Sequence, residues 1–323
     1  MKNIPPFTVT NRILQLSQDI SYELGILSGA KIYPVPIALR RKNKIKTIQS
    51  SLAIEGNTLT TQNVTDIIDG KRVLAPEKDI KEVLNAIAVY DKLPGWNPLS
   101  IKSFKKAHSI LMSGLTEYNG MWRNSGVGIF KGTEITHMAP PAKRIPALMD
   151  DLFNYLKQEK EVPWLIKACI FHYELEFIHP FIDGNGRMGR LWQQLLLMKE
   201  NPIFEFISVE SMIKHNQTKY YAVLGACDKK GESTEFITFS LEQILTTLKQ
   251  YTESNTSQVN DAKSRLAYAK EKLHNKWFTR KQYISLQNNI ASATASRDLI
   301  KGVQERILAK KGKSNRTCYC FLP

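Results

Sequence analysis

The residues with the clearest chemical use lie together, and they are His179, Asp183, the run Gly184, Asn185 and Gly186, and then Arg187 and Arg190. A histidine can take up a proton near neutral pH, and a carboxylate can hold Mg²⁺. A glycine-rich turn that opens a helix presents several N–H groups and the positive end of the helix dipole, which together bind anions. Two arginines three residues apart reach the same side of that helix, where cations are unfavourable without an anion. The stretch therefore predicts a polyphosphate site.

These residues carry a resemblance to a known family. The run His179-Pro-Phe-Ile-Asp-Gly-Asn-Gly-Arg-Met-Gly-Arg190 resembles the signature of Fic-domain proteins, His-x-Phe-x-(Asp/Glu)-Gly-Asn-Gly-Arg-x-x-Arg, with no departure at a defining position. The resemblance implies an all-α core. It also implies an adenylyltransferase that moves AMP from its co-substrate ATP, with Mg²⁺, to a Ser, Thr or Tyr hydroxyl of a target protein.

The resemblance also implies roles for single residues. His179 would be the general base, Asp183 the Mg²⁺ ligand, and residues 184–186 the phosphate cradle, with Arg187 and Arg190 on the β- and γ-phosphates. A phosphorylating relative carries lysine where this chain has Gly186, so the glycine favours adenylylation.

A second short motif lies ahead of the signature. Ser51-Leu-Ala-Ile-Glu55-Gly56 resembles the inhibitory motif (Ser/Thr)-x-x-x-Glu-(Gly/Asn) of this family, in which the glutamate pairs with the second signature arginine. Carried over, Glu55 would pair with Arg190 and compete with a phosphate for its guanidinium. Because both motifs lie in one chain, the enzyme is expected to be inhibited in cis.

Two other functions remain open from the sequence. The same site could remove AMP from a protein, with Glu55 positioning a water molecule. Alternatively, the chain could be a DNA-binding regulator whose Fic domain senses nucleotide.

Residues 116–141 depart from the helical pattern of the rest of the chain and predict a β-hairpin, with its strands within 128–138. The resemblance implies that this hairpin is a flap that holds a target loop as an added strand. The enzyme itself could also be a target. The resemblance places Tyr220 or Tyr221 near the adenine, although without it both tyrosines are typical of a core.

Apolar residues at helical spacing predict helices over most of the remaining chain, so the fold class is mainly α. His108 is expected to be a packed or surface histidine without chemistry. His172 and Glu176 have a spacing that can bind zinc, but no other residue completes a ligand set.

The net charge of +15 is concentrated near the C-terminus, since residues 261–323 hold 14 Lys/Arg against 4 Asp/Glu. This region predicts helix, turn, helix and hairpin, which resembles a winged helix. Its basic surface could bind DNA by counterion release, or it could be a protein-contact or dimerisation module.

We therefore expect an N-terminal helical region (1–98) with the inhibitory helix, a Fic core (99–250), a linker helix (251–275) and a winged-helix-like domain (276–323). No apolar run is long enough to span a membrane, the start lacks the apolar region of a secretory signal, and the four cysteines are sparse. A cytoplasmic protein, which could form a homodimer, is the expectation.

Overall fold

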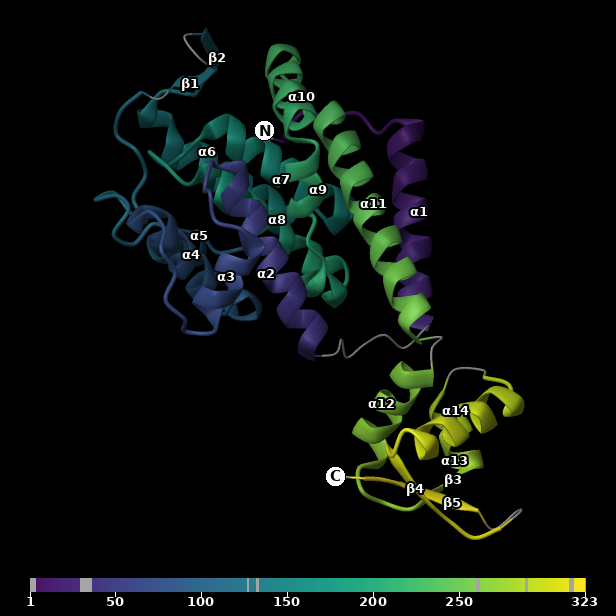
Figure 1. Ribbon diagram of the computed structural model, residues 1–323. Coiled ribbons are helices and arrows are strands. Elements are labelled where there is room, and N and C mark those ends of the chain that lie inside the picture. The colour runs from purple at the N-terminus through teal and green to yellow at the C-terminus, as the bar shows by residue number, and fades with distance from the viewer. Residues whose placement is uncertain are drawn as a thin grey trace. The chain divides into compact units, whose positions relative to one another are not determined.

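The computed structural model describes residues 4–29, 37–126, 128–131, 134–259, 262–287, 290–313 and 317–322. The chain divides into two compact units (Figure 1). The first unit is formed by residues 1–25 and 33–249, and the second by residues 26–32 and 250–323. The prediction of a mainly helical protein is confirmed.

Helices make up nearly all of the first unit. In chain order they are α1 (Asn11–Gly29), α2 (Ile37–Ile54), α3 (Thr61–Ile68), α4 (Glu77–Tyr90), α5 (Ile101–Leu111), α6 (Ile145–Gln158), α7 (Trp164–Ile178), α8 (Asn185–Glu200), α9 (Glu210–His215), α10 (Gln217–Lys230) and α11 (Thr234–Val259), of which α1 and α11 continue into the second unit. Two strands, β1 (Gly128–Lys131) and β2 (Glu134–Met138), form an antiparallel pair. This pair lies where the hairpin was predicted.

Helices α7 and α8 form the centre of the first unit. Both are buried around most of their circumference, which is typical of a helix enclosed by others rather than lying on a surface. A Cβ on Gly189 would lie 2.7 Å from Cδ2 of His172, so the glycine allows the two helices to approach closely. The pair connects directly to the signature, because α7 ends one residue before it and α8 begins within it.

An aromatic cluster fixes the signature loop to this centre. The Phe104 ring of α5 lies 4.9 Å from Trp192 of α8 and 5.5 Å from Phe181 of the loop, measured between ring centroids. All three side chains are fully buried. Burying rings of this size stabilises a fold by a few kcal/mol each, roughly 1.5–3 for a phenylalanine, so the loop cannot shift without a large loss.

The second unit has its own apolar core. It contains α12 (Ala262–Leu273), β3 (Phe278–Thr279), α13 (Arg280–Leu286), α14 (Ser292–Gln304), β4 (Leu308–Lys311) and β5 (Cys318–Phe321). The strands form an antiparallel sheet in the order β3-β5-β4. The expected linker helix 251–275 includes α12, whose Leu266 and Ala269 pack into this core, so α12 belongs to the unit and is not a spacer.

One buried ion pair joins the helices of the second unit. Arg265 of α12 donates from Nε and Nη2 to the Asp298 carboxylate of α14, at 2.5 and 2.7 Å. The Tyr283 hydroxyl of α13 donates to the same carboxylate at 3.2 Å. None of the helices in the described part of the chain is long and apolar enough to cross a membrane.

Replacing Asp298 with alanine would leave the Arg265 guanidinium buried without its carboxylate. We expect Asp298→Ala to destabilise the second unit by about 3 kcal/mol, the usual cost of breaking a buried pair from one side. Hydrogen exchange of residues 262–322 measures this loss. Glu305→Ala, which removes an exposed carboxylate of the same unit, is the control and should change exchange little. Equal effects of the two substitutions would contradict the assignment.

Candidate active site

His179 lies at the end of α7 in a left-handed conformation, with φ 48° and ψ 60°. Such a conformation costs a non-glycine residue about 1–2 kcal/mol and persists only where neighbouring contacts hold it. Its N–H donates to the Leu175 carbonyl at 2.9 Å. Its Nδ1 lies 3.3 Å from the Glu176 carbonyl, which can only accept, so Nδ1 carries the proton. The lone pair that a general base needs is then on Nε2.

Arg123 holds the His179 turn from outside. Its Nε donates to the His179 carbonyl at 2.7 Å, and its two Nη groups donate to the carbonyls of Ser125 and Pro140, each at 2.6 Å. Ser125 and Pro140 lie before β1 and after β2, so one buried side chain fixes both ends of the hairpin segment to the turn. The sequence analysis gave Arg123 no role, since its partners are backbone groups that only the fold brings together.

His108 of α5 is a second support that the sequence analysis missed. Its Nδ1 accepts the N–H of Gly120 at 2.8 Å, so Nε2 carries the proton and donates to the Asp183 carbonyl at 2.9 Å. The imidazole also stacks on Phe181, with 3.5 Å between centroids. Burial lowers the pKa of His108 to about 4, which keeps the ring neutral in the tautomer that these two bonds require.

The start of α8 has the backbone geometry of an anion site. Gly184 has φ 86°, and a Cβ there would lie 2.8 Å from the Met112 sulfur, so only glycine fits. The Asn185 side chain exchanges two hydrogen bonds of 2.9 Å with the backbone of Phe181. Asn185 thus contributes its backbone N–H to the nest, while its side chain fastens the loop. The first N–H groups of α8 have no partner within the helix and can receive a phosphate.

Arg190 is bound to the end of α2. Its side chain is 1% exposed, and it donates to the Ser51 hydroxyl at 3.1 Å, the Ser51 carbonyl at 2.9 Å and Glu55 Oε1 at 2.7 Å. Burial acts to lower the pKa of Arg190, but the Glu55 carboxylate outweighs it and raises the pKa. The structure thus contains the ion pair that the resemblance implies.

The Glu55 carboxylate lies directly over the nest. A Cβ on Gly186 would be only 2.3 Å from Glu55 Oε1, so the carboxylate lies against the backbone where the helix begins. The Glu55 side chain is 29% exposed, so part of it already faces solvent, into which it could turn away from Arg190. An anion seated on this nest and the Glu55 carboxylate would compete for the same space and the same guanidinium.

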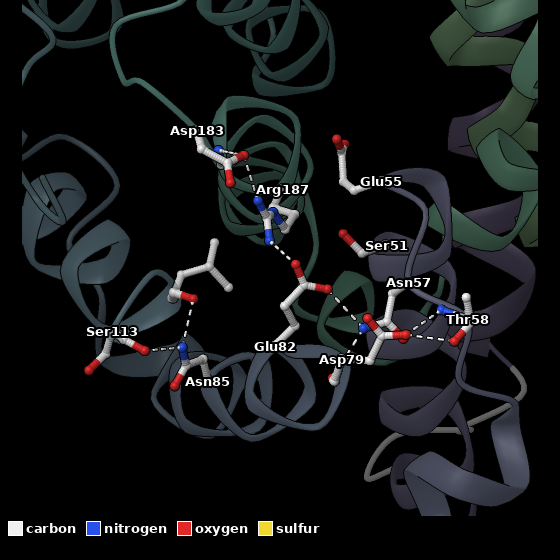
Figure 2. A network of polar contacts seen from close by, with 12 residues as sticks. Ser51, Glu55, Asn57, Thr58, Asp79, Glu82, Asn85, Ser113, Asp183 and Arg187 are labelled. Carbon is white, nitrogen blue, oxygen red and sulfur yellow. Dashed lines mark hydrogen bonds and ion pairs between the residues drawn. The ribbon is translucent and has the colours of Figure 1, made fainter. Parts of the chain in front are cut away.

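Arg187 lies between two carboxylates. Its Nη2 donates to Asp183 Oδ1 at 2.7 Å, and its Nη1 donates to Glu82 Oε1 of α4 at 3.1 Å (Figure 2). Partial burial acts to raise the pKa of Asp183, but Arg187 and the Gly184 N–H lower it, so the carboxylate stays ionised. Its side chain is 53% exposed. An ionised, accessible carboxylate beside an anion site fits Mg²⁺, which commonly takes one or two carboxylates together with substrate phosphates.

The two tyrosines have different environments. Tyr220 is fully buried, and its hydroxyl donates to Nε2 of His172 at 3.1 Å. Tyr221 is 46% exposed, and Glu55 is among the groups that raise its pKa, after burial. Only Tyr221 is therefore accessible to a nucleoside. His172 is neutral, since burial lowers its pKa to about 3, and no cluster of three potential metal ligands occurs among the described residues.

Comparison with known proteins identifies the family of the chain. Residues 98–197 match the Fic/DOC family. A Fic family protein from Desulfovibrio desulfuricans G20 has a crystal structure that superimposes with a TM-score of 0.77 at 36% identity, covering 99% of this chain and 98% of that one. The chain belongs to the Fic family.

Two curated relatives carry names that state an activity. Protein adenylyltransferase Fic of Nematostella vectensis is 29% identical over 260 residues, 76% of this chain and 58% of its own length. A probable protein adenylyltransferase of Aquifex aeolicus is 29% identical over 161 residues, 47% of this chain and 48% of its own. The chain spans about half the length of these relatives.

The neutral state of His108 predicts a pH dependence. The pKa of His108 is lowered to about 4 in the folded chain against 6.5 for a free histidine, so its contribution to stability is lost as the pH falls from about 6.5 to about 4. The free energy of unfolding should be higher for the wild type than for His108→Gln at pH 7. We expect this difference to shrink by about 3 kcal/mol between pH 7 and pH 4. Urea unfolding at several pH values measures it. An advantage that does not change with pH would contradict the assignment.

Proposed function

We propose that the chain is a protein adenylyltransferase that moves AMP from ATP to a Ser, Thr or Tyr hydroxyl of a target protein. The single observation that carries the proposal is the meeting of His179, Asp183, Arg187 and Arg190 around the open end of α8. The names of the curated relatives support the same activity.

The proposed reaction is an in-line displacement at the α-phosphorus. The target hydroxyl oxygen forms a bond to that phosphorus, its proton goes to Nε2 of His179, and the bond to the β-phosphate oxygen breaks to release pyrophosphate. The nest at residues 184–186 and Arg187 stabilise the charge that develops on the phosphates. Mg²⁺ held by Asp183 would neutralise phosphate charge when bound.

We also propose that the enzyme is inhibited in cis. In the structure Arg190 has its carboxylate partner in Glu55, and that carboxylate covers Gly186. A γ-phosphate would need both the guanidinium and this space. Release of Glu55 would then switch transfer on without rearranging α7 or α8.

The β1–β2 pair is the proposed docking element for the target. Each strand of this two-stranded sheet is an edge strand, so its free main-chain groups can pair with an added strand of the target. Main-chain pairing would fix the position of a target hydroxyl and would not require one particular target sequence. Arg123 connects the two ends of this segment to the His179 turn. A strand docked on the segment would therefore keep a fixed position relative to the proposed base.

Labelling with α-³²P-ATP and Mg²⁺ tests the transfer and the inhibition together. Glu55→Gly should raise incorporation into lysate proteins and into the enzyme itself about tenfold or more. A tenfold rise corresponds to removing about 1.4 kcal/mol of competition between Glu55 and the phosphate for Arg190. Adding His179→Ala should then lower it about 10²-fold or more, because the base is lost. The control is Glu77→Gly, which removes an exposed carboxylate of α4 and should leave labelling unchanged.

The outcomes separate the candidate activities. If no variant takes up label, transfer of AMP is refuted. Release of free AMP by the wild type from a protein labelled by another enzyme would then show the alternative activity, in which water hydrolyses the AMP–protein bond. If the wild type already labels as strongly as Glu55→Gly, the inhibitory role is refuted while transfer stands.

The charge of the second unit favours a second function, binding of duplex DNA. Arg297 and Lys301 of α14 are exposed, as are three lysines in and after β4, Lys310, Lys311 and Lys313. The nearby Asp298 is neutralised by Arg265 inside the unit and does not offset them, whereas Glu305 lies 3.8 Å from Lys301 and offsets part of its charge. Helix α14 and the neighbouring strand β4, with this excess of cations, suit a phosphate backbone.

Salt dependence tests DNA binding. Affinity for a duplex, measured by fluorescence anisotropy between 50 and 300 mM KCl, should fall steeply with salt for the full chain, and Arg297→Ala/Lys301→Ala should reduce the slope by about 2. The control is Lys102→Ala/Lys160→Ala, which removes two exposed cations of the first unit. Absent binding, or equal losses in both variants, would refute the assignment and favour a protein partner for this unit.

A further inference from the structure

Glu82 of α4 contacts two parts of the site that are far apart in sequence. Its Oε1 accepts from Arg187 Nη1 at 3.1 Å, and its Oε2 accepts from Asn57 Nδ2 at 2.8 Å. Figure 2 shows the carboxylate between these two donors. Glu82 is only 6% exposed. A buried carboxylate needs such partners, because an isolated buried charge is strongly unfavourable.

Asn57 belongs to the turn that ends the inhibitory helix. It follows Glu55 and Gly56 directly, and its N–H donates to the Leu52 carbonyl of α2 at 3.1 Å. Its side chain accepts from Leu59 N–H at 3.0 Å and donates to the Asp79 carbonyl at 3.1 Å as well as to Glu82. The first turns of α4 therefore hold the end of α2 at the place from which Glu55 reaches Arg190.

Asp79 strengthens this attachment. Its carboxylate accepts from both the N–H and the hydroxyl of Thr58, at 3.0 and 2.6 Å. Asp79 is on the solvent side of the turn, whereas Glu82 is on its buried side, where the phosphate site lies. Only Glu82 of this pair also contacts a signature residue.

Arg187 depends on Glu82 for its orientation. The guanidinium is bound to Asp183 through Nη2 and to Glu82 through Nη1, while its buried Nε has no partner among the described residues. If Asp183 held Mg²⁺, Glu82 would be the remaining carboxylate on Arg187. That contact would leave Nη2 to donate to a phosphate.

We propose that Glu82 is a positioning residue that orients Arg187 for a nucleotide phosphate and, through Asn57, holds the end of the inhibitory helix. The inhibitory helix and the phosphate site thus share one buried carboxylate. A change at Glu82 itself therefore acts both on the orientation of Arg187 and on the end of the helix that carries Glu55. This inference rests on the proposed adenylyl transfer.

Two substitutions separate the two contacts. Glu82→Gln keeps the shape of the side chain but puts an amide N–H₂ against one of two donors, so it disturbs both contacts. Asn57→Ala removes the contact with Glu82, together with the Asn57 bonds to the Asp79 carbonyl and the Leu59 N–H, and leaves Glu82 on Arg187. Each is made in the wild type and in Glu55→Gly, and thermal unfolding establishes that the variants fold; Glu82→Asp and Asn57→Ser replace any that does not.

The first measurement is binding of a non-hydrolysable ATP analogue with Mg²⁺, by calorimetry. In the Glu55→Gly background, Glu82→Gln should weaken binding about tenfold and raise KM for ATP with a smaller change in kcat, because Arg187 is misoriented. Glu82→Asp, which keeps the charge, should restore part of the affinity. Asn57→Ala should change affinity and transfer rate less than about twofold in this background.

The second measurement is labelling with Glu55 in place. Asn57→Ala should raise it several-fold over the wild type, since the end of α2 is less firmly held. Unchanged analogue affinity in Glu82→Gln would overturn the role toward Arg187. Labelling of Asn57→Ala at the wild-type level would overturn the role toward the inhibitory helix. If Glu55→Gly itself takes up no label, the proposed function fails, while the calorimetry still decides whether Glu82 positions Arg187.

Discussion

The Arg190 guanidinium is charged at every physiological pH and is nearly inaccessible to water. A buried charge of this kind requires an anionic partner, and removing that partner alone costs several kcal/mol, roughly 3–5. In this structure the partner is Glu55, with Ser51 supplying two further acceptors from the same helix. The end of α2 is therefore bound to α8 through this guanidinium. If Glu55 leaves, the same requirement favours a phosphate in its place, so the proposed inhibition and the proposed nucleotide site have a common physical origin.

The loop between α7 and α8 is held by groups outside it, so it needs no rearrangement to receive a ligand. Phe181 fixes it to the aromatic core, His108 binds the Asp183 carbonyl, and Arg123 binds the His179 carbonyl. Catalytic groups held by packed neighbours keep a productive geometry, which is how a site stabilises charge without reorganising. The end of α2 is different, because its glutamate is partly exposed and is held by a few polar contacts around Asn57. This contrast supports the proposed role of α2 in inhibition.

The sequence predicted helices over most of the chain, and α8 begins, as expected, at the glycine-rich turn of the signature. Helix α7 is buried on nearly every side, so it shows little periodicity and is recognisable mainly as an apolar run. The Glu55–Arg190 pair was predicted only from the resemblance, since no local pattern relates residues 135 positions apart. The roles of His108, Arg123 and Glu82 were missed for the same reason. Their partners are 75, 56 and 105 positions away, and several are backbone carbonyls that carry no sequence signal. Tertiary contacts of this kind are decided by packing and not by local residue type.

The central claim is that Glu55 and the terminal phosphate of ATP compete for Arg190. Crystal structures of the wild type and of Glu55→Gly, each with Mg²⁺ and a non-hydrolysable ATP analogue, test it most directly. The account predicts that Arg190 stays on Glu55 in the wild type and contacts the γ-phosphate only in Glu55→Gly. A wild-type complex in which Arg190 binds the γ-phosphate while Glu55 remains paired with it would contradict the account.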